Sequence, residues 1–146
     1  MDVKVFLDWL RRRFGERVDW YYEPESEVRR VFNVPPDRSA CDAVFHAAVC
    51  GITLVEEKSR SGVGKAVKQL RACAVWLRSL DYDIRRLIIL IEVIPASEAR
   101  RFRVRKRDLR LMEKRGGEWR PVLVLGRPVY AVFKKALGRR GIERWL

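Results

Sequence analysis

The segment CDAVFHAAVCGITLVEEK, residues 41–58, holds the pattern that decides the fold of this 146-residue chain. It contains two apolar runs, residues 41–47 and 51–58, separated by a short connection. This arrangement predicts an antiparallel β-hairpin. Asp42 begins the first arm and Glu56 ends the second, so the two carboxylates are expected to meet at one edge of a sheet.

Three charged residues, Glu56, Glu57 and Lys58, stand at the end of the second arm. Because side chains alternate between the faces of a strand, Glu56 and Lys58 are expected on one face and Glu57 on the other. Two carboxylates that meet on adjacent strands can hold Mg²⁺ through their oxygen atoms. The sequence therefore predicts a divalent-metal site with a lysine ammonium beside it, a combination suited to phosphodiester hydrolysis.

The segments after the hairpin predict a helix and a central strand. Residues 65–80 place apolar side chains on one helical face and carry Gln69, the sole glutamine of the chain. Residues 86–94 are almost entirely apolar, which is typical of a strand buried on both faces and reached by a crossover connection.

The segments before the hairpin are less uniform. Residues 3–14 have the apolar stripe of an amphipathic helix that ends at a glycine, and residues 17–22 are short, aromatic and strand-like. Residues 23–39 are polar and broken by prolines, so they predict mostly loop. Within that loop, residues 27–32 are compatible with a turn of helix or with a short strand.

The pattern changes after Pro95. Two short runs, residues 109–114 and 118–125, flank Gly116-Gly117 and predict a second hairpin. Residues 128–137 place apolar side chains at helical spacing with a glycine just beyond, which predicts a C-terminal helix. The expected organisation is an α/β core over residues 1–96 and a basic extension over residues 97–146, a β-hairpin plus helix, packed on the same domain.

This order of elements, with Asp42, Glu56, Lys58 and Gln69, resembles the PD-(D/E)xK nuclease superfamily and its restriction-endonuclease-like αβββαβ core. Residues 1–95 carry the resemblance and look most similar to the small archaeal Holliday-junction resolvases and related endonuclease domains. The resemblance implies a metal-dependent endonuclease that hydrolyses phosphodiester bonds in DNA, with Mg²⁺ or Mn²⁺ as its cofactor.

The resemblance also implies a role for each residue of the motif. Asp42 and Glu56 would be metal ligands through their side chains, and Glu57 would be a ligand through its backbone carbonyl. Lys58 would orient or activate the attacking water and offset charge on the phosphate. Gln69 matches a glutamine that is often found near the site on the following helix.

Two positions of this sequence depart from the superfamily pattern. In addition, one glutamate of the resolvases has no clear counterpart in this sequence. Cys41 stands where the motif has the proline that gives it its name, and Cys73 stands where an aromatic residue sometimes follows the glutamine. The glutamate that resolvases carry on their first helix could be matched by Glu16 or by Glu27. A resolvase works as a homodimer, so a homodimer is an implied assembly, although no segment of the sequence encodes its interface.

The net charge of +13 is concentrated in the C-terminal third, where residues 97–146 hold 16 Lys and Arg against 5 Asp and Glu. Such a concentration of positive charge favours binding to a polyanion. DNA is a better candidate partner than a membrane, because the arginines do not line one amphipathic helix. The alternative is that the charge serves solubility only. The residues expected to contact DNA are Arg60, Lys65, Arg100, Arg101, Arg103 and Arg105.

The composition indicates the compartment and the kind of host in which the protein is expected. No apolar run approaches the roughly 18 residues of a membrane span, and the N-terminus lacks the features of a signal peptide, so a cytoplasmic protein is expected. A single Asn, Gln and Thr beside 35% charged residues is typical of a thermophile. Three cysteines do not fit a zinc site, and a Cys41–Cys50 disulfide across the hairpin stays open.

Two functions from different classes are compatible with these observations. The first is a Mg²⁺-dependent deoxyribonuclease that uses Asp42, Glu56, Lys58 and Gln69. The second is a non-catalytic DNA-binding protein on the same fold, in which the basic third carries the function.

Overall fold

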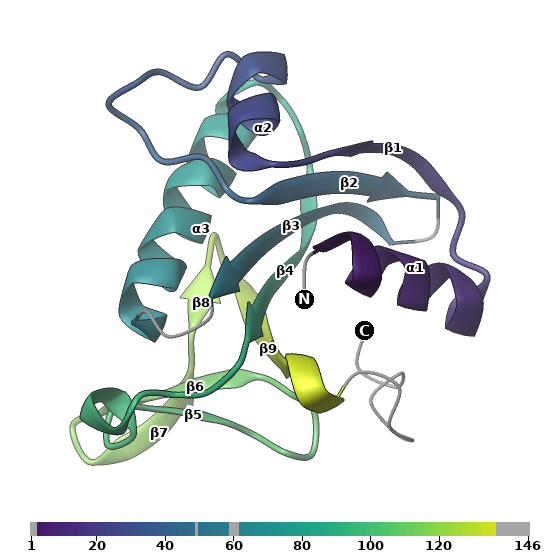
Figure 1. The fold of residues 1–146 in the computed structure, drawn as a ribbon. Coiled ribbons are helices and arrows are strands. Elements are labelled where there is room, and N and C mark those ends of the chain that lie inside the picture. The colour runs from purple at the N-terminus through teal and green to yellow at the C-terminus, as the bar shows by residue number, and fades with distance from the viewer. Residues whose placement is uncertain (1–2, 49, 59–61, 137–146) are drawn as a thin grey trace.

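A computed structural model of the chain describes residues 3–48, 50–58 and 62–136, which form a mixed α/β structure (Figure 1). None of the helices in these ranges is long and apolar enough to cross a membrane. The helices and strands are, in chain order, α1 (Val3–Phe14), β1 (Val18–Tyr22), α2 (Glu25–Val31), β2 (Ala43–Ala47), β3 (Gly51–Lys58), α3 (Val63–Ser79), β4 (Ile84–Ile91), the 3₁₀ turn η1 (Ala96–Glu98), β5 (Phe102–Val104), β6 (Leu111–Arg115), β7 (Glu118–Pro121), β8 (Leu123–Val124), β9 (Arg127–Phe133) and the 3₁₀ turn η2 (Lys134–Ala136).

Six strands form the main sheet in the order β1-β2-β3-β4-β9-β8. The pairs β1–β2, β2–β3 and β8–β9 are antiparallel, whereas β3–β4 and β4–β9 are parallel. Parallel neighbours need a crossover, which α3 provides between β3 and β4. The strands β5, β6 and β7 form a separate antiparallel sheet, called here the small sheet, which lies below the main sheet in Figure 1.

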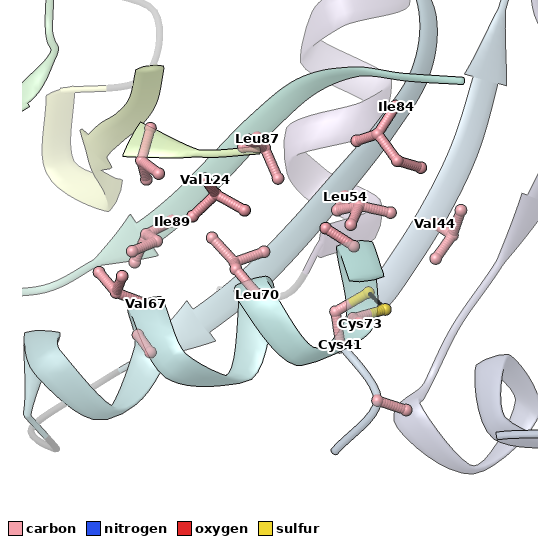
Figure 2. Close-up of a cluster of buried hydrophobic side chains, with 14 of the residues drawn as sticks. Cys41, Val44, Leu54, Val67, Leu70, Cys73, Ile84, Leu87, Ile89 and Val124 are labelled. Carbon is pink, nitrogen blue, oxygen red and sulfur yellow. Dashed lines mark hydrogen bonds between the residues drawn. The ribbon is translucent and has the colours of Figure 1, made fainter. Parts of the chain in front are cut away.

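The main sheet is covered by helices on both faces, α3 on one and α1 on the other. On the α3 face, Leu54 and Leu87 belong to the same buried cluster as Leu70 of the helix (Figure 2). On the other face, Phe45 and Ile88 pack with the apolar stripe of α1. Burial of one such side chain contributes about 1.5–3 kcal/mol, so the position of β3 between the two clusters is well determined.

Most elements of the first two thirds occupy the predicted ranges. The helix predicted over residues 3–14 is α1, and the predicted hairpin is formed by β2 and β3. Residues 27–32 proved to lie mainly in helix α2 rather than in a strand. The second hairpin is confirmed by the pairing of β6 with β7, where Gly116 and Gly117 adopt φ values of 55° and 82°.

The predicted C-terminal helix over residues 128–137 is wrong. Residues 127–133 form strand β9, which inserts into the main sheet parallel to β4. Val129 and Ala131 face the α3 side, whereas Val132 packs on the α1 side. The segment is thus apolar on both faces. Its apolar residues also fit helical spacing, but pairing with the buried edge of β4 makes it a strand.

Candidate metal centre

The β2–β3 hairpin brings Asp42 and Glu56 to the same edge of the main sheet. Ala43 pairs with Val55, so Asp42, one residue before β2, stands opposite Glu56 near the end of β3. Asp42 Oδ2 accepts a hydrogen bond from the backbone N–H of Glu57 at 2.7 Å. This bond holds the Asp42 carboxylate against the end of β3.

Glu56 is deeply buried, with 2% of its surface exposed. Lys58 Nζ lies 3.6 Å from Glu56 Oε1, as expected for two residues on one face of a strand. Among the described residues, no hydrogen-bond donor reaches Oε2 of the ionised Glu56 side chain. A buried oxygen that lacks a partner is costly unless something else satisfies it, so Oε2 is available to coordinate a cation.

The surroundings of Glu56 act strongly on its protonation. Burial, the charge of the nearby Asp42 carboxylate and a hydrogen bond of protonated Glu56 with that carboxylate raise the pKa of Glu56 to about 9, against the opposing effect of the Lys58 ammonium. Burial outweighs the ion pair because one ammonium at 3.6 Å does not replace the hydration that the carboxylate has lost. In the absence of a cation Glu56 therefore carries a proton at neutral pH, and a bound divalent cation would displace that proton.

Glu57 points away from this group of residues, onto the other face of the sheet. Its Oε1 accepts a hydrogen bond from Lys134 Nζ of η2 at 2.7 Å, and the lysine side chain is 10% exposed. The alternation predicted for residues 56–58 is therefore present in the structure, with no bulge that exchanges the two glutamates. The Glu57 side chain has a structural partner in η2, directly after β9.

Gln69 lies on α3, the helix that covers the face of the sheet on which Glu56 stands. Its Oε1 is buried and, within the described part of the chain, has no hydrogen-bond partner. Leu54, two residues before Glu56, packs in the same cluster as Leu70 of α3 (Figure 2). An unpaired amide oxygen and an unpaired carboxylate oxygen thus occur on facing elements.

The cysteines form a pair that the sequence did not predict. Cys41 Sγ and Cys73 Sγ lie 2.7 Å apart, with both side chains fully buried (Figure 2), whereas Cys50 is half-buried and separate from them. The Cys41–Cys50 disulfide left open by the sequence is therefore not formed. Instead, the residue before Asp42 contacts α3 one turn after Gln69.

Asp42 and Glu56 suit a hard divalent cation, because they offer carboxylate oxygens, one of which is unpaired in the described structure. The described residues contain no group of three or more His, Cys, Asp and Glu that could hold a metal. Further ligands would therefore come from the Glu57 backbone carbonyl, from water or from substrate, as is usual for Mg²⁺.

Neither alternative for the first-helix glutamate reaches this centre. Glu16 pairs with Arg86 at 2.8 Å, and both side chains are buried. Arg86 also donates to Thr53 Oγ1 at 2.9 Å, and Thr53 alternates with Glu56 along β3, so this ion pair belongs to the other face. Glu27 is bound to Arg30 on α2.

The residues predicted to bind DNA lie in two parts of the chain, Arg60 and Lys65 near the start of α3 and the four arginines between residues 100 and 105. Lys65 and Arg100 are exposed, and Arg101 stacks on the Phe102 ring at 4.7 Å. Arg103 lies 4.3 Å above the Trp119 ring, and Arg105 is engaged in an ion pair with Asp108. Arg60 lies outside the described residues.

Comparison of the chain with protein-family models, with curated proteins and with solved structures found no match. Function is therefore inferred from the geometry and charge of the described residues.

Proposed function

We propose that the protein is a divalent-metal-dependent DNA endonuclease of the PD-(D/E)xK type. One observation carries the proposal: buried Glu56, whose Oε2 has no partner among the described residues, stands opposite Asp42 and beside Lys58. The element order α1, β1, β2, β3, α3, β4 supports the assignment, because it follows the αβββαβ order of the superfamily core, with α2 added.

Each residue of the centre would have its own role in phosphodiester hydrolysis. Asp42 and Glu56 would hold Mg²⁺ or Mn²⁺, which when bound supplies Lewis-acid polarisation of the phosphate. Lys58 would place its ammonium next to the Glu56 carboxylate, where it orients the attacking water and offsets charge that develops on the phosphate. Gln69 would add a neutral hydrogen-bonding group from α3.

The rival function is a DNA-binding protein without catalysis. The net charge of +13 is sufficient for non-specific binding of a polyanion whether or not the centre is active. The two functions differ in whether DNA breakdown depends on metal and on Asp42, and this difference is measurable.

The decisive experiment compares the wild-type protein with Asp42→Ala. Titration calorimetry with Mn²⁺ and Mg²⁺, with and without duplex DNA, should show metal binding that disappears in Asp42→Ala. Cleavage of duplex, single-stranded and branched DNA, measured over a temperature series, should disappear with it. DNA binding in the absence of metal should be retained or slightly tighter, because a carboxylate that faces phosphate has been removed.

Asp8→Ala is the matched control, since Asp8 is a half-exposed carboxylate on α1 that pairs only with Arg11 in the described structure. It should bind metal and cleave DNA like the wild type. Metal binding that is absent, or that survives in Asp42→Ala, would reject the nuclease and leave the binding protein as the function.

A further inference from the structure

A groove of about 310 Å³ runs between α3 and the small sheet. Its helix wall is the stripe Gly64, Val67, Lys68 and Arg71, one continuous face of α3. Gln69 belongs to a neighbouring stripe and does not line the groove, so the groove is separate from the carboxylate centre. The other wall comes from β5, β6, β7 and the segment that leads into β8.

The register of the small sheet decides which side chains reach the groove. Phe102 pairs with Glu113, and Glu113 pairs with Arg120, so these three stand in a row on one face. Arg115, two residues after Glu113, shares that face. Arg103 and Lys114 stand on the opposite face, where both lie over the Trp119 ring.

The groove is strongly positive. Its lining contains five cationic side chains and one carboxylate, Glu113, which gives a net lining charge of +4. The cationic side chains are Lys68, Arg71, Arg101, Arg115 and Arg120.

Glu113 holds two of these arginines in place. Its carboxylate pairs with Arg115 at 2.5 Å and with Arg101 at 3.3 Å. Arg101 also lies on the ring of Phe102, which is buried and forms an apolar floor. A guanidinium has five N–H donors, so each arginine keeps donors free after it has bound Glu113, and the pair is oriented before any ligand arrives.

The start of α3 is not part of this anion site. Glu98 accepts hydrogen bonds from the N–H groups of Val63 at 2.6 Å and Gly64 at 3.1 Å, so a carboxylate of the chain already satisfies the helix terminus. An anionic ligand would instead lie along the stripe from Gly64 to Arg71, about 10 Å at 1.5 Å per residue. That length exceeds what one phosphate group needs and suits a chain of phosphates.

We propose that this groove binds the phosphodiester backbone of a nucleic-acid strand. Forked guanidinium donors match phosphate oxygens, the apolar floor accommodates sugar, and the positive lining neutralises successive phosphates. The proposal deepens the proposed function, because it takes the nucleic-acid substrate from it. It assigns the phosphate contacts to Lys68, Arg71, Arg101, Arg115 and Arg120. Of these residues, only Arg101 was expected from the sequence to contact DNA.

The test compares two triple variants by fluorescence anisotropy with a labelled DNA duplex, in chelator and over a series of salt concentrations. The groove variant is Lys68→Gln, Arg115→Gln and Arg120→Gln, which changes exposed side chains. The control is Lys106→Gln, Arg107→Gln and Lys114→Gln, which removes the same charge from other exposed positions, one of them on the opposite face of the small sheet. Circular dichroism confirms that both variants fold.

The groove variant should bind at least about tenfold more weakly, with the salt dependence flatter by roughly 0.9 for each lost phosphate contact. The control should lose clearly less of both. Equal losses in the two variants, or none in the groove variant, would overturn the proposal. Competition by inorganic phosphate or a mononucleotide as effective as that by an oligonucleotide would also overturn it, because the groove would then be a small-anion site.

The chelator separates this proposal from the nuclease itself. Groove-dependent binding in a protein that shows no metal-dependent cleavage would uphold the groove and refute the nuclease. Asp42-dependent cleavage with groove-independent binding would uphold the nuclease and refute the groove.

Discussion

At Glu56, burial and the neighbouring Asp42 carboxylate act together against the charged form. The pKa of Glu56 rises to about 9, well above its value in an unfolded chain. Between these two values the folded protein binds the proton that the unfolded chain releases. The contribution of Glu56 to stability is thus complete at pH below about 4 and is lost as the pH rises toward 9.

A stability measurement against pH should reveal this loss. In metal-free protein, the free energy of unfolding of wild type relative to Glu56→Gln should fall by about 1.4 kcal/mol for each pH unit between the two pKa values. Urea titrations from pH 5 to pH 9 would measure it. A difference that stays constant across this range would show that Glu56 does not titrate as the burial of its side chain requires.

The opposite faces of β3 predict unequal roles for the two glutamates. Glu56→Gln should abolish single-turnover cleavage as completely as Lys58→Ala, because Glu56 would hold the metal and Lys58 would act at the phosphate. Glu57→Gln is the nearly isosteric control and should retain most activity, since its carboxylate pairs with Lys134. Activity in Glu56→Gln with loss in Glu57→Gln would exchange these roles, and activity in all three variants would remove the motif from the mechanism.

At the scale of single elements, β9 is the part of the fold whose pairing most needs a test. Val132 is fully buried in it and packs on the α1 side of the sheet. Val132→Asp should lower the free energy of unfolding by several kcal/mol, because an unpaired carboxylate would enter an apolar core. The measurement is the midpoint of urea unfolding at neutral pH.

Val93→Asp is the control for that variant. Val93 is 52% exposed just after β4, so the same substitution should cost less than about 0.5 kcal/mol there. Comparable losses in the two variants would contradict the burial of β9.

The elements that could be predicted from sequence are those whose pattern is local. The apolar stripe of α1 and the alternation of β3 depend on neighbours in the chain, and both appear where expected. β9 was missed because its apolar residues fit helical and strand spacing alike, and only the partner β4 decides between them. Helix α2 carried a usable signal, since Val28 and Phe32 are buried at helical spacing.

The contacts of the candidate site also fall into those that local sequence predicts and those that it does not. Asp42, Glu56 and Lys58 could be placed together because a hairpin relates them through short-range register. The contact between Cys41 and Cys73 and the ion pair of Glu16 with Arg86 could not, because each joins residues far apart in sequence. Such pairs depend on how the layers stack, which no local pattern encodes.

At the scale of the whole molecule, residues after 96 are built into the main sheet. A fragment of residues 1–96 lacks β9 and leaves Leu87–Ile91 of β4 without its neighbour. We expect this fragment to aggregate or remain unfolded, rather than to form a folded protein that binds DNA weakly. Circular dichroism and gel filtration would decide, and a monomeric fragment with a cooperative unfolding transition would contradict the expectation.

The order of β4 and β9 in the chain also has a consequence for biosynthesis, because β4 ends at Ile91 and β9 begins only at Arg127. While the ribosome is still translating the codons before Arg127, the apolar strand Ile84–Ile91 has no partner on one side, and an open apolar edge of this kind attracts chaperones and other nascent chains. The main sheet can close only after β9 has been translated. A nonsense or frameshift mutation anywhere upstream of codon 127 should therefore behave as a complete loss of the gene product through aggregation or proteolysis, and not as a shortened protein with partial activity.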